Sequence, residues 1–238
     1  MNNFHLIFFL LLIFKPNIQS QDSGDSGPPK ARPKVSFVKI SPQVKSNFIL
    51  GHNGLRNRVA LRKDKPASNM NLIAWDLQME MKAKSWIVSC YGSMSPPNYC
   101  QVPQLPGINR LHIDQLRTGW EFSTIRLWFH YYRVTLDSDL DSLKRPTTYT
   151  QIIWASVRWF GCALAQIDET YYVVACSYQP SGNIPRMAVY KTGDPCSHCE
   201  DIEACSVTFS GLCGIDKSRA SVKSFTLMLS VALAVTIF

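Results

Sequence analysis

The sequence predicts an α+β domain in which helices cover an antiparallel sheet. Three segments in the first half of the chain repeat apolar residues at helical spacing, and a fourth has the form of a short helix. Two adjacent segments in the second half are rich in aromatic and β-branched residues and are separated by a polar turn. Helices followed by a hairpin are typical of α+β domains rather than of alternating α/β folds.

The first three helices are expected at 45–60, within 72–90 and at 121–134. Aromatic stripes at helical spacing are more often core than ligand contacts, so we interpret these faces as buried. His52 lies on such a face and is interpreted as a hydrogen-bonded core histidine rather than a metal ligand. The three faces carry Phe48, His52, Leu55 and Val59 in the first helix, Leu72, Trp75, Met79, Trp86 and Cys90 in the second, and Phe122, Ile125, Phe129 and Tyr132 in the third.

The fourth helix is expected within RPTTYTQIIWA, residues 145–155. Thr148 and Gln151 are three positions apart, which is the spacing of a capping box at a helix start. We therefore predict that Thr148 caps this helix. A short strand is expected later in the chain, at 186–190.

The hairpin is predicted from the segments 157–165 and 170–178, which flank the polar pair Asp168–Glu169. Cys162 and Cys176 lie at similar distances on either side of this turn. Antiparallel pairing about the turn would place the two cysteines opposite each other. The sequence therefore predicts a cross-strand disulfide.

All eight cysteines are expected to form disulfides, because an even number in a chain with a secretory signal indicates oxidation. Cys90 and Cys100 enclose a loop with two prolines, and a bond between them would close it. The last four cysteines offer two alternatives, a pair of disulfides or a four-thiolate zinc site. An oxidising compartment favours the disulfides. These four are Cys196, Cys199, Cys205 and Cys213.

The N-terminal part of the chain has the pattern of a secretory signal peptide. A nine-residue apolar run at 6–14 precedes Ser20, after which we expect cleavage, so 1–20 is assigned to the signal. An uncleaved anchor is disfavoured because about 17 or more apolar residues are needed to span a bilayer. A flexible leader is expected at 21–44, where 21–34 is rich in Gly, Pro and Ser.

The C-terminal segment 215–238 has the pattern of a lipid-anchor signal. Its last 14 residues are apolar and would form a helix of about 21 Å, shorter than the roughly 30 Å hydrocarbon core. We therefore expect a glycosylphosphatidylinositol anchor, with Ser218 or Gly214 as the attachment residue. A short membrane helix and a plain secreted tail are the alternatives.

The charge balance gives little support for nucleic-acid binding. Lys15, Arg219 and Lys223 lie in the two segments expected to be removed, which leaves 22 basic and 17 acidic residues, a net charge of +5. The basic residues are scattered, with no basic stripe interleaved with aromatics. We therefore expect no nucleic-acid partner.

Five segments carry a resemblance to a known family over roughly 45–213. The chain resembles the cysteine-rich secretory, antigen 5 and pathogenesis-related superfamily (CAP or SCP domain), in its insect antigen 5-like (venom allergen-like) branch. The resemblance implies a three-layer α–β–α sandwich at 45–193 and a cysteine-rich, hinge-like segment at 194–214. It also implies the bonds Cys196–Cys205 and Cys199–Cys213. The segments are HNGLRNRVA (52–60), MNLIAWD (70–76), YTQIIWA (149–155), CSYQPSGN (176–183) and VYKTGDPCSHC (189–199).

Many members of that superfamily carry two histidines and two glutamates around a central cleft, and some bind a divalent ion there. The corresponding positions here are Met94, Ile108, Tyr131 and Thr148. None offers an imidazole or a carboxylate, so we expect no metal and no cofactor. Four polar residues nearby match no ligand spacing: His112, Asp114, Glu121 and His130.

The resemblance and the altered positions together predict a non-catalytic protein, secreted or held at the outer cell surface, that binds an extracellular protein. The alternative is a lipid or sterol carrier, with the ligand under the loop Met94–Pro106, where Pro96, Pro97, Tyr99 and Leu105 lie. A hydrolase has the least support, because no catalytic motif is present. Membrane contact is expected only through the C-terminal anchor.

Overall fold

The computed structural model describes residues 31–200 and 204–215. The chain divides by its internal contacts into Met1–Ala31 and Arg32–Phe238, and every described helix and strand belongs to the second unit. The expected signal peptide, residues 21–30 of the leader, and residues 216–238 of the anchor signal, with Ser218, lie outside the described residues. Within the described ranges, no helix combines the length and apolar character needed to cross a membrane.

The sheet has five strands in the order β1-β4-β5-β3, with the short β2 paired to β4 beside this path. Every pairing is antiparallel except that of β2 with β4, which is parallel. The two longest strands therefore lie at the centre of the sheet, and β3 lies at an edge. The strands are β1 Val35–Val38, β2 Ala74–Trp75, β3 Ile108–Ile113, β4 Trp159–Ile167 and β5 Tyr171–Gln179.

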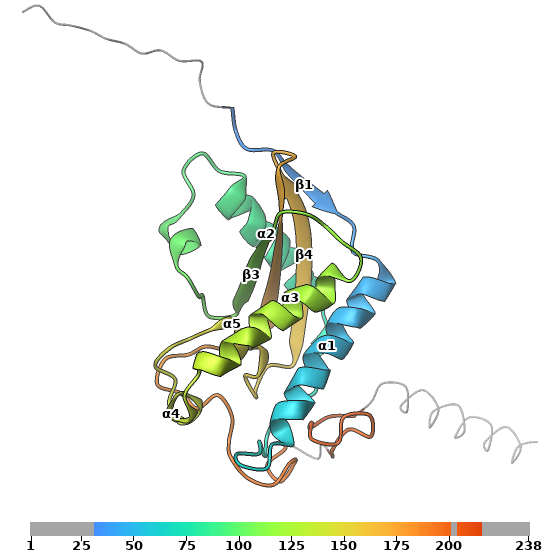
Figure 1. The fold of residues 1–238 in the computed structure, drawn as a ribbon, viewed down its shortest axis with the longest axis vertical. Helices are drawn as coiled ribbons and strands as arrows, with labels where there is room; N and C mark the ends of the chain where they lie inside the picture. The colour runs from blue at the N-terminus through green and yellow to red at the C-terminus, as the bar shows by residue number, and fades with distance from the viewer. Residues whose placement is uncertain (1–30, 201–203, 216–238) are drawn as a thin grey trace, which may run out of the picture. The chain divides into compact units, whose positions relative to one another are not determined.

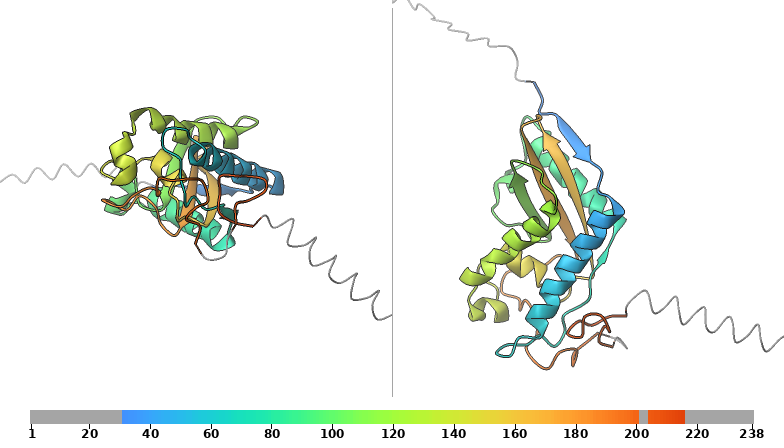
Figure 2. Two further views of the ribbon diagram at one scale, coloured as in Figure 1. Left: turned by 90° about the horizontal axis from the view of Figure 1, so that it is seen from below. Right: turned by 45° about the vertical axis from the view of Figure 1, so that its right-hand side comes forward.

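Helices cover both faces of the sheet (Figures 1 and 2). Helix α2 packs on β4 and β5 from one side, while α1, α3 and α5 pack together on the other. This arrangement confirms the predicted α+β fold and its three α–β–α layers. The helices are α1 Pro42–Ala60, α2 Leu77–Tyr91, α3 Trp120–Phe129, α4 Asp137–Asp141 and α5 Thr148–Ile152, with 3-10 helices η1 Asn98–Gln101 and η2 His130–Val134.

The alternation of side chains along β4 explains the two layers, because successive residues of a strand point to opposite faces. Phe160, Cys162 and Leu164 belong to the larger core under α1, α3 and α5, whereas Ala163 belongs to the core under α2. Gly161 lies on the α2 side as well, where a Cβ would come within 2.2 Å of the backbone nitrogen of Glu80. The backbone of α2 therefore rests directly on the strand.

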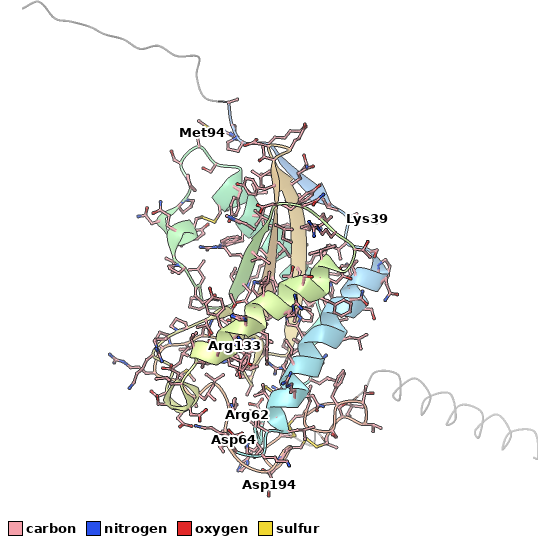
Figure 3. All side chains as sticks on the ribbon, in the orientation of Figure 1. Lys39, Arg62, Asp64, Met94, Arg133 and Asp194 are labelled. Atoms are coloured by element: carbon pink, nitrogen blue, oxygen red, sulfur yellow. A yellow bond between two sulfur atoms is a disulfide. The ribbon has the colours of Figure 1, made fainter. Side chains whose placement is uncertain are left out.

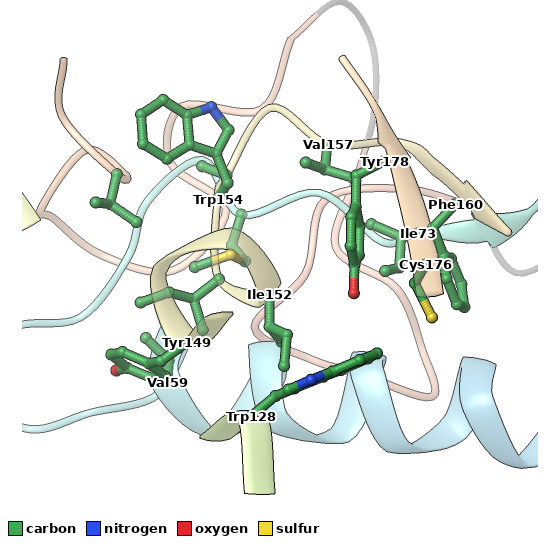
Figure 4. Close-up of a cluster of buried hydrophobic side chains, with 14 of the residues drawn as sticks. Val59, Ile73, Trp128, Tyr149, Ile152, Trp154, Val157, Phe160, Cys176 and Tyr178 are labelled. Carbon is green, nitrogen blue, oxygen red and sulfur yellow. The ribbon is translucent and has the colours of Figure 1, made fainter. Parts of the chain in front are cut away.

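The larger core is built from aromatic and aliphatic side chains of the sheet and of the helical layer that contains α1, α3 and α5 (Figure 4). Its members come from α1, the segment before β2, α3, α5 and both central strands. This layer therefore depends on contacts between segments far apart in the sequence. The labelled residues are Val59, Ile73, Trp128, Tyr149, Ile152, Trp154, Val157, Phe160, Cys176 and Tyr178.

The predicted hairpin is confirmed. Asp168 and Glu169 have φ values of 46° and 61°, the left-handed conformation that a tight two-residue hairpin turn requires. The register pairs Cys162 with Cys176, and a disulfide joins them. The turn therefore sets both the strand register and this bond.

The second helix begins later than predicted. Asp76 caps it by accepting a hydrogen bond from the backbone nitrogen of Met79 at 2.9 Å, so α2 begins at Leu77. Leu72 and Trp75 lie before the helix, and Trp75 belongs to β2. The apolar spacing of these two residues fitted a helix, but the cap and the pairing with β4 exclude them from it.

The third helix was predicted with part of its buried face misplaced. Ile125 and Trp128 are buried, whereas Phe122 and Tyr132 are about half exposed. The α-helix ends at Phe129 and continues as the 3-10 helix η2. A 3-10 helix has fewer residues per turn than an α-helix, so residues of η2 such as Tyr132 do not lie on the side of the segment that α-helical spacing predicts.

Two edge strands were not predicted, and one predicted strand does not form. β1 lies inside the expected flexible leader 21–44 and pairs with β4, so the ordered domain begins before residue 45. β3 was not recognised. The segment 186–190 is not a strand, because the backbone of Val189 bonds to Leu140 of α4 and to Ala155 in the loop after α5 instead of to the sheet.

Candidate functional site

Thr148, predicted from the sequence to correspond to the family's second histidine, is the first residue of α5. Its hydroxyl donates to the backbone oxygen of Trp128 in α3 at 3.0 Å. The cap is Thr147, whose side chain accepts from the nitrogen of Thr150 at 3.1 Å. The prediction that Thr148 is the cap was therefore wrong by one residue. Gln151 does not take part in the predicted capping box, because its amide oxygen accepts a hydrogen bond from the backbone nitrogen of Gly107.

The other three positions do not converge on one cleft. Ile108 begins β3 and is packed half-buried against the α2-side core, and Tyr131 lies half exposed on η2. Met94 lies on the loop after α2 with 51% of its surface exposed. Figure 3 places Met94 near one end of the domain, well separated from Arg133 of η2. The aligned position at Met94 is therefore not part of a site with η2.

A chain of neutral hydrogen bonds runs through the interior beside Ile108 and Thr148. Gln104 donates to the side-chain oxygen of Asn109 at 3.0 Å, and Asn109 donates to the hydroxyl of Tyr178 at 3.4 Å. The Tyr178 hydroxyl lies 2.9 Å from His52 Nε2, and His52 Nδ1 lies 2.8 Å from the carbonyl oxygen of Phe48. Because a carbonyl only accepts, Nδ1 carries the proton and Nε2 accepts from tyrosine.

His52 is a core residue, as its place on the first helix predicted. Its side chain is fully buried and both ring nitrogens are hydrogen-bonded. Burial lowers the pKa of His52 to about 4. The imidazole is therefore neutral at physiological pH, and neither nitrogen is available to a metal or a substrate.

Arg56 is a buried residue that sequence reasoning missed. Its guanidinium donates to the carbonyl oxygens of Asn71, Ile152, Trp154 and Ala155 at 2.7 to 3.1 Å. Burial lowers the pKa of Arg56 to about 9, so the group stays protonated at neutral pH. Its sequence signal is its spacing of four from the core residue His52, which places both on one helical face.

Glu121 and His112 are held by separate partners in the structure. Glu121 is buried and accepts from Asn47 Nδ2 at 2.7 Å. His112 Nε2 lies 2.5 Å from the hydroxyl of Tyr91, and partial burial lowers the pKa of His112. His130 begins the exposed η2, and Asp114 directly follows β3. These four residues therefore do not form a substitute metal site in the described part of the chain.

Among the described residues, the one grouping with metal-ligand spacing is Cys196, Cys199 and Cys213. All three are engaged in disulfides, so they present no thiolate. The bonds are Cys90–Cys100, Cys162–Cys176, Cys196–Cys205 and Cys199–Cys213, which together use all eight cysteines of the chain. These are the four pairs that the sequence and the family resemblance predicted.

The C-terminal cysteine-rich segment is folded onto the domain. The backbone of Cys213 accepts from Leu72 at 2.7 Å and donates to Met70 at 2.7 Å. Gly214 is buried, and its amide donates to Ala204 at 2.9 Å. Of the two anchor-attachment candidates, Gly214 therefore belongs to the folded segment.

A hollow of about 370 Å³ opens where the C-terminal end of α1 meets η2, α4 and α5. We call it the arginine–aromatic pocket. Phe129, Tyr132 and Tyr149 form one wall, with ring centroids 5.1 to 6.4 Å apart. The Arg58 guanidinium lies 6.0 Å over the Phe129 ring. The full lining is Arg58, Val59, Arg62, Asp64, Phe129, Tyr132, Thr135, Asp137, Leu140 and Tyr149.

The two arginines of this pocket differ in their partners. Arg62 pairs with Asp64, labelled beside it in Figure 3, and lies 3.6 Å from Asp137. Arg58 is exposed, and its described contact is the ring of Phe129. Burial raises the pKa of Tyr149 to about 12, so this phenol does not act as a base near neutral pH.

A second hollow, of about 340 Å³, lies on the α2 side beneath the loop at 92–107. Tyr99 and Pro106 of the expected lipid-binding loop line it, together with Trp86 and Ile108. Leu105 packs against the α2-side core below. The loop is closed by the bond Cys90–Cys100, as its two cysteines suggested.

Known proteins share this architecture. The profile described as "CAP: Cysteine-rich secretory protein family" matches residues 51–178, more than half of the chain, and the chain belongs to this family. Human "Cysteine-rich secretory protein 2" is 27% identical over 209 residues, which cover 82% of this chain and 78% of that protein. The "Cysteine-rich venom protein" of Tityus serrulatus is 26% identical over 192 residues, with coverages of 74% and 47%. The chain thus spans about half of the scorpion protein.

Solved structures agree with this assignment. The crystal structure of NaASP2 with Zn2+ is similar with a TM-score of 0.58 at 25% identity, covering 74% of this chain and 97% of that one. The sandwich seen here is therefore the fold of the family. The zinc in that structure belongs to NaASP2.

Proposed function

We propose that this protein is a non-catalytic, extracellular CAP-domain protein that binds a partner without a metal. The observation that carries the proposal is the chemistry of the four aligned positions, Met94, Ile108, Tyr131 and Thr148, which offer no imidazole and no carboxylate. The buried histidine His52 is neutral and has both ring nitrogens occupied by hydrogen bonds. Four disulfides support an oxidising, extracellular location.

The arginine–aromatic pocket is the surface we propose for partner binding. Tyrosine and arginine are enriched at the energetically important centres of protein interfaces. Here Tyr132 is half exposed and Arg58 is not paired with a carboxylate in the described part of the chain. An acidic side chain of a protein partner would find a cation at Arg58 and an aromatic wall beside it.

The test is affinity capture from extracellular fluid with the full chain displayed on cells. The variants are Arg58→Ala and Tyr132→Ala, and the matched control is Met81→Ala on the exposed face of α2. We expect one protein to be retained by the wild type and the control and lost from both pocket variants. Equal retention by all four chains would exclude this pocket as the binding surface.

The absence of a metal is tested separately by calorimetric titration of the protein with zinc, calcium and magnesium, beside thermal melts with and without zinc. We expect no saturable binding near micromolar concentration and no change in Tm. Binding that disappears in His112→Ala or His130→Ala would show a rebuilt site and would overturn the non-metal part of the proposal.

A lipid or sterol carrier is the second candidate, and the hollow beneath the loop at 92–107 favours it. Tyr99, Trp86 and Ile108 give this hollow apolar walls. The test is extraction of lipids from the purified protein, followed by titration with a sterol and a fatty acid. Saturable binding that is weakened in Tyr99→Ala would support the carrier function, whereas an empty extract without saturable binding would exclude it.

We further propose attachment to the outer cell surface through a lipid anchor at Ser218, since Gly214 is buried in the folded segment. Release of the protein from cells by a phosphatidylinositol-specific phospholipase C would support the anchor, and retention with an intact C-terminal peptide would contradict it. Assignment to the insect antigen 5-like branch stays a prediction. His52 and His112 give no support to a hydrolase, since His52 is buried and His112 is bonded to Tyr91.

A further inference from the structure

Large apolar side chains are exposed along α3, η2 and the two residues that follow η2. Six of them are between 46% and 60% exposed, although the inner side of the same segment is already packed through Ile125 and Trp128. Burying these six is therefore not needed to complete the core. We call the surface the α3–η2 face; its apolar members are Phe122, Leu127, Tyr131, Tyr132, Val134 and Leu136.

The charges on this face have one sign. Residues 120–136 include Arg126, His130 and Arg133, and Glu121 is their one carboxylate. Glu121 is 4% exposed and is hydrogen-bonded to Asn47, so it does not reach the surface. The α3–η2 face therefore presents cations without an exposed carboxylate of its own.

The carboxylates that follow the face are engaged. Asp137 lies 3.6 Å from the Arg62 guanidinium, and Asp139 is buried and accepts from Arg145 at 2.8 Å. Asp139 is paired one to one, whereas Asp137 shares the Arg62 guanidinium with Asp64 and stays 64% exposed. The exposed negative charge therefore lies at the C-terminal end of the face, after Arg126 and Arg133 in the sequence.

The shape and composition of this surface suit the boundary between water and a bilayer. Helix α3 forms an outer surface of its layer in both views (Figures 1 and 2). Arginine buries its aliphatic stem while its head stays at the lipid headgroups, and tyrosine favours the same depth. The Arg133 guanidinium already lies 5.9 Å over the ring of Tyr132, which joins the two groups in one contact.

We propose that the α3–η2 face docks on an anionic phospholipid surface. Apolar side chains would enter the interfacial region while Arg126 and Arg133 contact anionic headgroups. A second copy of the chain is disfavoured as the occupant, because the same face would bring like charges together. The face shares Tyr132 with the arginine–aromatic pocket, so the variants that test the membrane contact leave Tyr132 unchanged. The membrane contact would add to the expected C-terminal anchor.

The test is sedimentation of the full chain with vesicles of phosphatidylcholine alone or mixed with phosphatidylserine. Binding to vesicles without phosphatidylserine measures the contribution of apolar segments anywhere in the chain. The difference in binding between the two kinds of vesicle therefore measures the effect of the lipid charge. Two variants change the face: Arg126→Glu with Arg133→Glu, and Leu127→Ser with Val134→Ser. Two controls make equivalent changes elsewhere: Lys39→Glu with Lys82→Glu, and Leu77→Ser with Met81→Ser.

We expect the charge variant to lower partitioning onto anionic vesicles by about tenfold or more, since each basic residue near the surface contributes about a factor of five. The apolar variant should also lower it, while each control changes it by less than about twofold. High salt should weaken binding of the wild type.

Equal losses in the charge variant and its control would show that only net charge matters and would overturn the proposal. Wild-type binding that is the same for both vesicles would also overturn it. Two further results would overturn it. One is a dimer, measured by light scattering, that the face variants dissociate while vesicle binding stays unchanged. The other is heparin binding that the face variants abolish while vesicle binding stays unchanged. Thermal melts of all variants identify any loss that comes from unfolding.

Discussion

The two faces of the central sheet are covered in different ways. On the α2 side, the strands present glycine and alanine, so the helix backbone lies close to the sheet, as at Gly161 and Ala163. On the other side, three helices meet a core of large aromatics that also holds the buried polar groups His52, Asn53 and Arg56. The first layer is held by close packing, and the second by packing together with hydrogen bonds from side chains to backbone carbonyls.

The buried polar side chains of the second layer are mainly neutral. Asn109 and Thr148 lie in the second layer, where Asn109 donates to the carbonyl oxygen of Thr148 at 2.9 Å. These neutral groups have defined partners, and they involve no buried charge without a partner. Among the described residues of this layer, the Thr124 hydroxyl and the Gln151 amide nitrogen are buried without a hydrogen-bond partner. Arg56 is the one fully buried cation among the described residues, and carbonyl oxygens surround it.

The largest effect is expected when the polar layer loses Arg56. Arg56→Met keeps most of the side-chain volume but leaves the carbonyls of Asn71, Ile152 and Trp154 without their donor. We expect the free energy of unfolding to fall by about 4 kcal/mol, measured by denaturant titration. Arg58→Met is the control, because Arg58 is exposed on the same helix. A loss below about 1 kcal/mol at Arg56 would show that water replaces the donor.

The close-packed layer is tested by Gly161→Ala. The added Cβ would meet the backbone of α2 at Glu80, which cannot move without displacing the helix. We expect a loss of about 3 kcal/mol in the free energy of unfolding. Gly54→Ala is the matched control, since a Cβ there meets nothing within 4 Å, and the change should stabilise α1 by about 0.5 to 1 kcal/mol. Similar effects of the two changes would contradict the close contact.

The pH dependence of stability reports on His52. Its folded pKa is about 4, below the value of about 6.5 expected in the unfolded chain, so the unfolded state binds the proton first. Stability is therefore full above about pH 6.5 and is lost as the pH falls toward 4, by about 2 kcal/mol at pH 4.5. His52→Gln should flatten this part of the curve of unfolding free energy against pH. His112 contributes with the same sign, so an unchanged slope in His52→Gln would assign the effect elsewhere.

The smallest effect distinguishes the two threonines at the start of α5. Thr147→Ala removes the cap and should lower the free energy of unfolding by about 1 kcal/mol, whereas Thr148→Ala removes one hydroxyl contact and should cost about half as much. Thermal melts on both variants measure the difference. A larger loss at Thr148 would contradict the cap assignment.

Local patterns predicted much of the fold because the relevant interactions are close in sequence. The hairpin and its disulfide follow from the turn at Asp168–Glu169, and the first helix follows from its apolar spacing. The errors arose where a distant partner decided the outcome. β1 forms because β4 offers it a free edge, and the segment 186–190 is not a strand because its backbone bonds to α4 and to the loop after α5.

The sequence by itself determined the fold class, the hairpin register and the absence of imidazole and carboxylate at the four aligned positions. Each of these depends on residue type, local spacing or recognisable motifs. Only the tertiary structure decided that Met94 lies away from η2, that Arg56 binds backbone carbonyls of two distant segments, and that the α3–η2 face remains exposed. These features depend on packing between segments up to about a hundred residues apart, which the local pattern of residues does not specify.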